Sequence, residues 1–198
     1  MGAHLLANLA TQAVYLGHAQ DAARLAEAAI DGAGRAPASV RARLYTTAAG
    51  AYGRSGERRA CQNALAKAER AIDRANTAAE PHWVGYFSHA HLAGTALRCL
   101  SDLNLHQQAL RHAPNAIALA AHNTRTRALH TALIATIHAR AGDVDAACDW
   151  GRDLPQQAQN IRSARVARRV RELSYVLGQY RKAPGLEDFL LTLTGVPG

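Results

Sequence analysis

The sequence has few of the residues that stabilise small secreted domains or bind metal ions. Its 3 cysteines, Cys61, Cys99 and Cys148, are far apart and form no Cys-x-x-Cys pair. An odd number of isolated cysteines predicts neither a disulfide framework nor a zinc knuckle. We therefore interpret the cysteines as small apolar residues that pack inside helices.

Long apolar segments and targeting signals are also lacking. No stretch reaches the roughly 18 consecutive apolar residues that a membrane span requires. The N-terminus has neither the charged segment nor the long apolar run of a signal peptide. We expect a cytoplasmic protein with no membrane association.

Motifs of the common enzyme classes are absent. The sequence contains no P-loop, no Gly-x-Gly-x-x-Gly turn, no Gly-x-Ser-x-Gly elbow and no carboxylate pair placed around a cleft. Its 10 histidines form no zinc-binding pattern; His89 and His91, for example, would point to different sides of a helix. We predict that the protein is not an enzyme and binds no metal and no cofactor.

Arginine and alanine dominate the residues that are present. The formal net charge is +8, and only two of the 23 basic residues are lysines, Lys67 and Lys182. Apolar residues make up 48% of the chain but aromatic ones only 5%, so any core must consist largely of alanine in closely packed helices. No segment shows the alternation typical of strands, which predicts an all-α fold.

Four turns repeat along the chain, each with Gly or Asn, a short polar stretch and a small residue five positions later. They span residues 16–22, 55–61, 103–109 and 141–147. Gly or Asn can adopt the left-handed conformation that ends a helix, and the small residue lets the next helix pack closely. The turns are 39, 48 and 38 residues apart, a period typical of a helical-repeat solenoid.

These turns predict one domain over 1–198, a right-handed α-solenoid closed by capping helices. The expected helix pairs are about 3–32, 40–75, 82–121 and 124–158, and the capping helices lie within about 163–193. The first helix should turn its larger apolar residues inward, namely Leu5, Leu6, Leu9, Ala13 and Leu16. We expect Pro114 to kink or delay its helix and Pro155 to erode the end of another.

The pattern of the second and fourth pairs resembles the tetratricopeptide repeat. In the second pair the matching positions are Tyr45, Ala48, Ala49, Tyr52, Cys61, Leu65 and Ala68. Three longer segments, 80–94, 140–148 and 162–173, resemble actinobacterial transcriptional regulators with an N-terminal helix-turn-helix domain and a C-terminal tetratricopeptide-like region. The resemblance covers essentially the whole chain, and only the repeat region of such proteins.

That resemblance implies ligand binding in a concave groove lined by the first helix of each pair. Polar stripes with arginines recur on these helices and suit a carboxylate, a peptide backbone or a phosphate. The candidate residues are Asn8, Thr11, Tyr15, Arg43, Thr47, Arg54, His91, Thr95, Arg98 and Arg140. The alternative is an ordinary solvated helix face. Where relatives usually carry acidic residues, this chain has Ser88, His89 and His91.

Two further sets of residues have alternative interpretations. Trp83, Tyr86 and Phe87 could stack on an aromatic ligand, but at this spacing they are more simply the packing face of a long helix. A basic helix later in the chain could contact phosphates, or it could be the charged outer face of a capping helix. The residues proposed for phosphate contact are Arg162, Arg165 and Arg169.

We therefore predict non-catalytic recognition of a peptide, a protein segment or a small signal in a regulatory pathway. Ligand binding would change the curvature of the solenoid or a homodimer contact, as the resemblance implies. One alternative is a scaffold that holds two proteins together. Another is direct nucleic-acid binding through the helix that carries Arg162 to Arg171.

Overall fold

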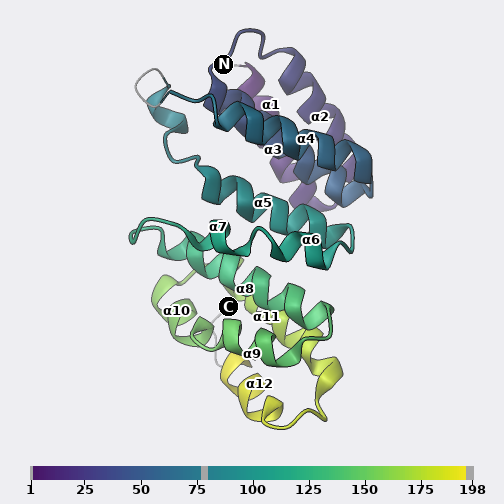
Figure 1. Cartoon of the computed structure of the whole chain (residues 1–198), viewed down its shortest axis with the longest axis vertical. Coiled ribbons are helices and arrows are strands. Elements are labelled where there is room, and N and C mark those ends of the chain that lie inside the picture. Colours follow the sequence, from purple (N-terminus) through teal and green to yellow (C-terminus); the bar gives the residue numbers. More distant parts are fainter. Residues whose placement is uncertain (1, 77–79, 195–198) are drawn as a thin grey trace. The chain divides into compact units, whose positions relative to one another are not determined.

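The computed structural model describes residues 2–76 and 80–194, and it confirms the all-α class. Within these ranges every regular element is a helix and there is no strand (Figure 1). The elements are α1 (Gly2–Leu16), α2 (Ala19–Asp31), α3 (Ala38–Ser55), α4 (Arg58–Ile72), η1 (His82–Val84), α5 (His89–Asp102), α6 (His106–Leu110), α7 (Ala113–Ile117), α8 (Thr124–Arg140), α9 (Val144–Gly151), α10 (Leu154–Ile161), α11 (Ala164–Leu177), η2 (Gly178–Tyr180) and α12 (Leu186–Thr194). They form two compact units, Met1–Leu105 and His106–Gly198.

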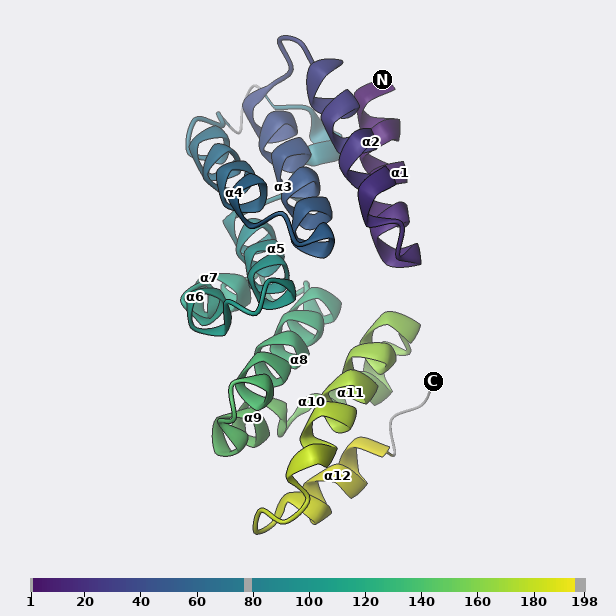
Figure 2. The same cartoon turned by 90° about the vertical axis from the view of Figure 1, so that its right-hand side faces the viewer.

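Helix α3 is the centre of the first unit. It packs against α1, α2, α4 and α5, and Figure 2 shows it between α2 and α4. Its buried residues are mostly alanine and glycine, so neighbouring helices come close. At Gly53 a Cβ atom would lie only 3.0 Å from the Cα of Cys99, which means that the backbones of α3 and α5 nearly touch.

Helix α8 has the corresponding place in the second unit. It packs against α6, α7, α9, α10 and α11, and α11 in turn packs against α12. Larger side chains fill this core, among them Leu154, Leu173, Leu177 and Leu186, each at most 1% exposed. Gly151 lies beneath Phe189, whose Cζ would be 2.7 Å from an added Cβ, so the Phe189 ring of α12 packs directly on the backbone of α9.

The predicted left-handed turns are confirmed at all four positions. Gly17, Gly56, Asn104 and Gly142 have φ angles of 90°, 81°, 58° and 83°. In each turn the N–H of the following residue donates to a carbonyl five positions back, as from Asp143 to His138 at 3.0 Å. The small residue five positions after each Gly or Asn is fully buried; these residues are Ala22, Cys61, Ala109 and Ala147. This is the Schellman helix end followed by close helix packing.

Two predicted helices are shorter than expected. The prediction of a continuous helix from His82 is wrong, because η1 ends at Val84 and α5 begins only at His89. The break contains Gly85, a poor helix former, and Ser88, whose carbonyl accepts from His91 and Leu92 as α5 starts. The helix expected up to residue 121 ends at Ile117.

The prolines act partly as predicted. Pro114 interrupts its helix as expected: α6 ends at Leu110, and α7 starts with Pro114 in its first turn. Pro155 does not erode a helix end but lies in the first turn of α10, after a break that follows Gly151. Proline is well tolerated there because the first-turn N–H groups have no partner within the helix.

The packing of α1 also differs from the prediction. Ala7 and Ala10 are fully buried, whereas Leu5, Leu9 and Leu16 are 59%, 50% and 74% exposed. The alanines allow α1 to lie close to its neighbours, and the larger leucines are left on the outer side. In the part of the chain that the structure describes, no helix has the length and apolar character needed to cross a bilayer.

Replacing Gly142 by Ala tests the left-handed turns. At φ 83° a Cβ meets no atom within 4 Å, so the cost is conformational only, about 1 kcal/mol of unfolding free energy. Gly178→Ala is the matched control in the same unit, because Gly178 has φ −56° and meets only the Arg181 side chain, at 4.0 Å. Urea unfolding should show a lower free energy of unfolding for Gly142→Ala and no decrease for Gly178→Ala. Equal losses would contradict this account of the turns.

Candidate functional site around Arg43

The guanidinium group of Arg43, on α3, is the centre of a polar cluster in the first unit. Its Nη2 donates to Asn8 Oδ1 on α1 at 2.6 Å, and its Nε donates to the Tyr86 hydroxyl at 2.8 Å. Its Nη1 lies 3.1 Å from His4 Nδ1, also on α1. Because an arginine can only donate, His4 Nδ1 must be the acceptor and carry no proton.

The segment around η1 is fixed to α3 and thereby brings Tyr86 to Arg43. The Glu80 carboxylate accepts from the backbone N–H of Ser39 at 3.2 Å and also from the Ser39 hydroxyl. Ser39 lies in the first turn of α3, where a negative charge is favourable. Val84 is fully buried in a cluster with Ala7 and Leu44, so hydrogen bonds to a carboxylate and an apolar contact hold this segment.

Aromatic rings surround the cluster. The His4 and Trp83 ring centroids are 4.5 Å apart, and the Tyr86 ring meets His91 edge-on at 5.8 Å. Trp83 and Tyr86 remain 45% and 55% exposed, so the expectation that they pack in the core is wrong. Only Phe87 packs against the core cluster, because the long helix on which that expectation rested is absent.

The positive charge of Arg43 has no neutralising partner among the residues that the structure describes. Among residues 2–76 and 80–194, no carboxylate lies within ion-pair distance of it. Its three hydrogen-bond partners are all uncharged. Since arginine has five N–H donors, two of them remain for a ligand. A pre-positioned guanidinium of this kind suits a carboxylate.

Two histidines near Arg43 have lowered pKa values. Burial lowers the pKa of His4, and the positive charge of Arg43 lowers it further. Burial alone lowers the pKa of His91, whose Nδ1 lies 3.0 Å from the Ser88 hydroxyl. Both rings are therefore neutral at neutral pH, as the contact between His4 and Arg43 requires.

The structure brings three of the predicted groove residues into or next to this cluster. Asn8 and Arg43 are hydrogen-bonded, and His91 adjoins them through Tyr86. The three predicted threonines, Thr11, Thr47 and Thr95, lie on the same helices, but each donates its hydroxyl to the carbonyl four residues earlier. In this state their protons are not directed at a ligand. Tyr15 is 40% exposed on α1.

Two arginines of the first unit that were predicted to line the groove do not belong to the cluster around Arg43. Arg54 Nη1 forms an ion pair with Asp102 of α5 at 3.4 Å. Arg98 lies across α3, where a Cβ at Gly50 would come within 3.3 Å of its Nη2. Both side chains therefore contribute to the contact between α3 and α5.

The remaining predicted residues belong to the second unit. Arg140 and Arg169 share the carboxylate of Glu172, at 2.8 and 2.6 Å. Arg162 has a left-handed conformation at the end of α10, with φ 45°, and Arg165 is exposed on α11. Part of the positive charge on α11 is thus neutralised by Glu172.

Sequence analysis missed Tyr86 as a partner of Arg43. The signal that could have found it is Gly85, which follows η1 and favours a break before α5, so that Tyr86 lies outside a helix. No spacing rule could have paired Tyr86 with a side chain 43 residues earlier, because helical periodicity relates only residues of one helix.

The search for metal-binding groups and the comparisons with known proteins identified no further site in the described residues. In the described ranges, no group of three or more His, Cys, Asp or Glu side chains could hold a metal ion. No protein-family model matches the chain, and no curated protein shows significant similarity to it. The arrangement around Arg43 therefore has to be interpreted from its own chemistry.

The lowered pKa values predict that acid destabilises the first unit. Below about pH 6.5, the ordinary histidine pKa, the unfolded chain takes up protons that the folded chain resists. The first unit therefore has its full free energy of unfolding above that pH, and this free energy decreases as the pH falls. Urea unfolding at about pH 7.5 and about pH 5.5 should show this loss. His91→Gln should reduce the pH dependence, and His18→Gln, at an exposed site, is the control for replacing a histidine as such. An unaltered pH dependence in His91→Gln would contradict the assignment.

Proposed function

We propose that this protein is a non-catalytic binding module that recognises a carboxylate-bearing peptide or protein segment at Arg43. The observation that carries the proposal is a guanidinium held by three uncharged side chains and left without a carboxylate partner among the described residues. A bound carboxylate would complete its hydrogen bonding and neutralise its charge.

The surroundings of Arg43 favour a peptide over a small ion. Trp83 and Tyr86 expose large aromatic surfaces beside the cation, and α1 exposes Leu5 and Leu9 next to the stripe that carries His4 and Asn8. Exposed apolar side chains around a specific polar group are typical of protein interaction sites. A segment with an acidic group and apolar side chains would match both features.

The resemblance to tetratricopeptide-like regulators supports the same proposal. We propose that the helix pairs stack as a right-handed solenoid, and that the protein acts in the cytoplasm of an actinobacterium-like organism in transcriptional regulation. The four Schellman turns are consistent with such repeats. A sensing function would require peptide binding to alter the conformation, whereas a scaffold would bind without such a change.

Direct nucleic-acid binding through α11 has weaker support. Arg169 is engaged with Glu172, which also binds Arg140. An arginine that already has a carboxylate partner must exchange it for phosphate, which reduces the gain from binding.

Selection of peptides on the intact chain tests the proposal. A displayed library of random peptides should yield sequences that combine an acidic side chain or a free C-terminus with apolar residues. Fluorescence anisotropy of a selected peptide should show about tenfold or greater loss of affinity for Arg43→Gln, because a charge-assisted hydrogen bond contributes about 1.5–3 kcal/mol.

Arg59→Gln is the matched control, since Arg59 is an exposed arginine of α4 in the same unit and its loss removes the same charge. It should bind the peptide like the unaltered chain. Circular dichroism should show that both variants keep their helices. Selected peptides without a carboxylate, or equal affinity of Arg43→Gln and the unaltered chain, would refute the proposed function.

A further inference from the structure

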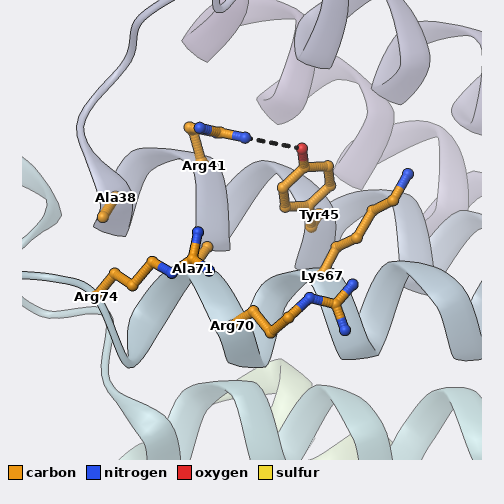
Figure 3. A pocket seen from close by; sticks show the side chains of 7 residues that line it. All are labelled: Ala38, Arg41, Tyr45, Lys67, Arg70, Ala71 and Arg74. Carbon is orange, nitrogen blue, oxygen red and sulfur yellow. Dashed lines mark hydrogen bonds between the residues drawn. The ribbon is translucent and has the colours of Figure 1, made fainter.

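A cavity lies between α3 and α4 in the first unit, and Arg43 does not line it. Its volume is about 260 Å³. Figure 3 shows the side chains around it, which come from the two helices and from the turn after α4. The lining residues are Ala38, Arg41, Tyr45, Lys67, Arg70, Ala71 and Arg74. The alanines leave the space open because they have no long side chain to fill it.

The lining contains four cationic side chains and no acidic one. Within the described part of the chain, none of these four side chains forms an ion pair. Arg41 Nη2 donates only to the Tyr45 hydroxyl at 3.4 Å, and Lys67 Nζ lies 5.8 Å from the centre of the Tyr45 ring. Tyr45 thus holds two of the cations at the cavity without neutralising them.

The placement of these charges does not stabilise the free protein. Lys67 and Arg70 are three residues apart on α4, where like charges repel, and Arg74 adds a further positive charge in the turn after the helix. Glu69 on the same helix lies about 160° around the axis from Lys67 and cannot reach the cavity side. An anion in the cavity would relieve this repulsion. The guanidinium groups that line the cavity would bind phosphate oxygens through paired hydrogen bonds.

The neighbouring cavity differs in its chemistry. It has a volume of about 480 Å³ and shares Tyr45 and Lys67 with the first. It is lined by uncharged Asn63 and by two acidic residues, Glu27 and Asp31. Glu27 accepts a hydrogen bond from Tyr52 at 2.6 Å. Its two carboxylates outnumber the one cation, Lys67, so it suits a phosphate group less well than the hydroxyl groups of a sugar, for which it offers acceptors. The two cavities therefore suit the two ends of one polar ligand.

We propose that the cationic cavity between α3 and α4 binds the diphosphate group of a small molecule. At about 260 Å³ it is smaller than a typical site for a whole drug-sized ligand, so it holds the phosphate end alone. The group can come from inorganic diphosphate or from a nucleoside diphosphate, whose sugar and base would lie in the neighbouring cavity. This site is independent of the peptide site at Arg43.

Isothermal titration with inorganic diphosphate, adenosine diphosphate and guanosine diphosphate at about 0.15 M salt tests the proposal. Saturable binding should weaken at least tenfold in Arg70→Glu and in Arg41→Gln. Arg59→Glu makes the same change of charge as Arg70→Glu at the other end of α4 and should bind normally. Arg43→Gln should also bind diphosphate normally. A negative result in this titration therefore refutes the diphosphate site and leaves the proposed peptide site untouched.

The two sources of diphosphate are distinguished by the neighbouring cavity. If a nucleotide is the ligand, it binds more tightly than inorganic diphosphate, and Asn63→Ala abolishes that difference. If inorganic diphosphate is the ligand, the affinities are equal and Asn63→Ala has no effect.

The proposal is overturned if no probe saturates the chain at millimolar concentration, or if Arg59→Glu weakens binding as much as Arg70→Glu. Much tighter binding of a single-stranded RNA, weakened by both changes, would also overturn it and indicate a nucleic-acid surface.

Discussion

The close packing of α3 against four neighbouring helices is the constraint on which the first unit depends. Two opposite sides of this helix are buried, and they consist mainly of small residues: Ala42, Thr46, Ala49 and Gly53 on one side, Val40, Leu44, Ala48 and Ala51 on the other. At Gly53 the contact with Cys99 leaves no room for a single methyl group. Any larger residue there must push α5 away and misplace the segment before it.

This packing leaves two stripes of α3 open, and they face opposite ways. One stripe carries Arg43 and Thr47, and the other carries Arg41 and Tyr45. On the first stripe a single cation is held by His4, Asn8 and Tyr86 beside exposed apolar rings. On the second, four cationic side chains line a cavity in which Tyr45 is the one aromatic residue of the lining. The first arrangement suits one carboxylate in an apolar context, and the second suits a compact, highly charged anion.

Much of the fold follows from local rules and was predictable. The left-handed turns depend on one residue each and on the small residue that follows, so the sequence pattern located all four. The all-α class follows from composition and periodicity in the same way. One prediction failed because the helix break near Gly85 depends on more than one weak signal. Another failed because α1 buries alanines and exposes leucines. Hydrophobicity alone assigns Leu5 to the core, although close helix contact favours Ala7.

The sites were less predictable because they join different helices. Helical spacing identified Asn8 and Arg43 as candidates, and they are hydrogen-bonded. It could not show that Tyr86 completes the cluster. The stripe of Lys67, Arg70 and Arg74 is visible in the sequence, but its meaning depends on Arg41 across the cavity. Periodicity describes one helix at a time, whereas a binding site depends on which helix lies opposite.

The central claim is that α3 presents two independent anion-recognition sites on opposite sides. It is tested most directly by NMR of the arginine Nε–Hε groups in the labelled chain, titrated separately with a selected acidic peptide and with inorganic diphosphate. The account predicts that the peptide shifts the Arg43 resonance and leaves Arg41, Arg70 and Arg74 unchanged, while diphosphate does the reverse. Shifts of both groups with either ligand, or an unchanged Arg43 resonance in the peptide complex, would contradict it.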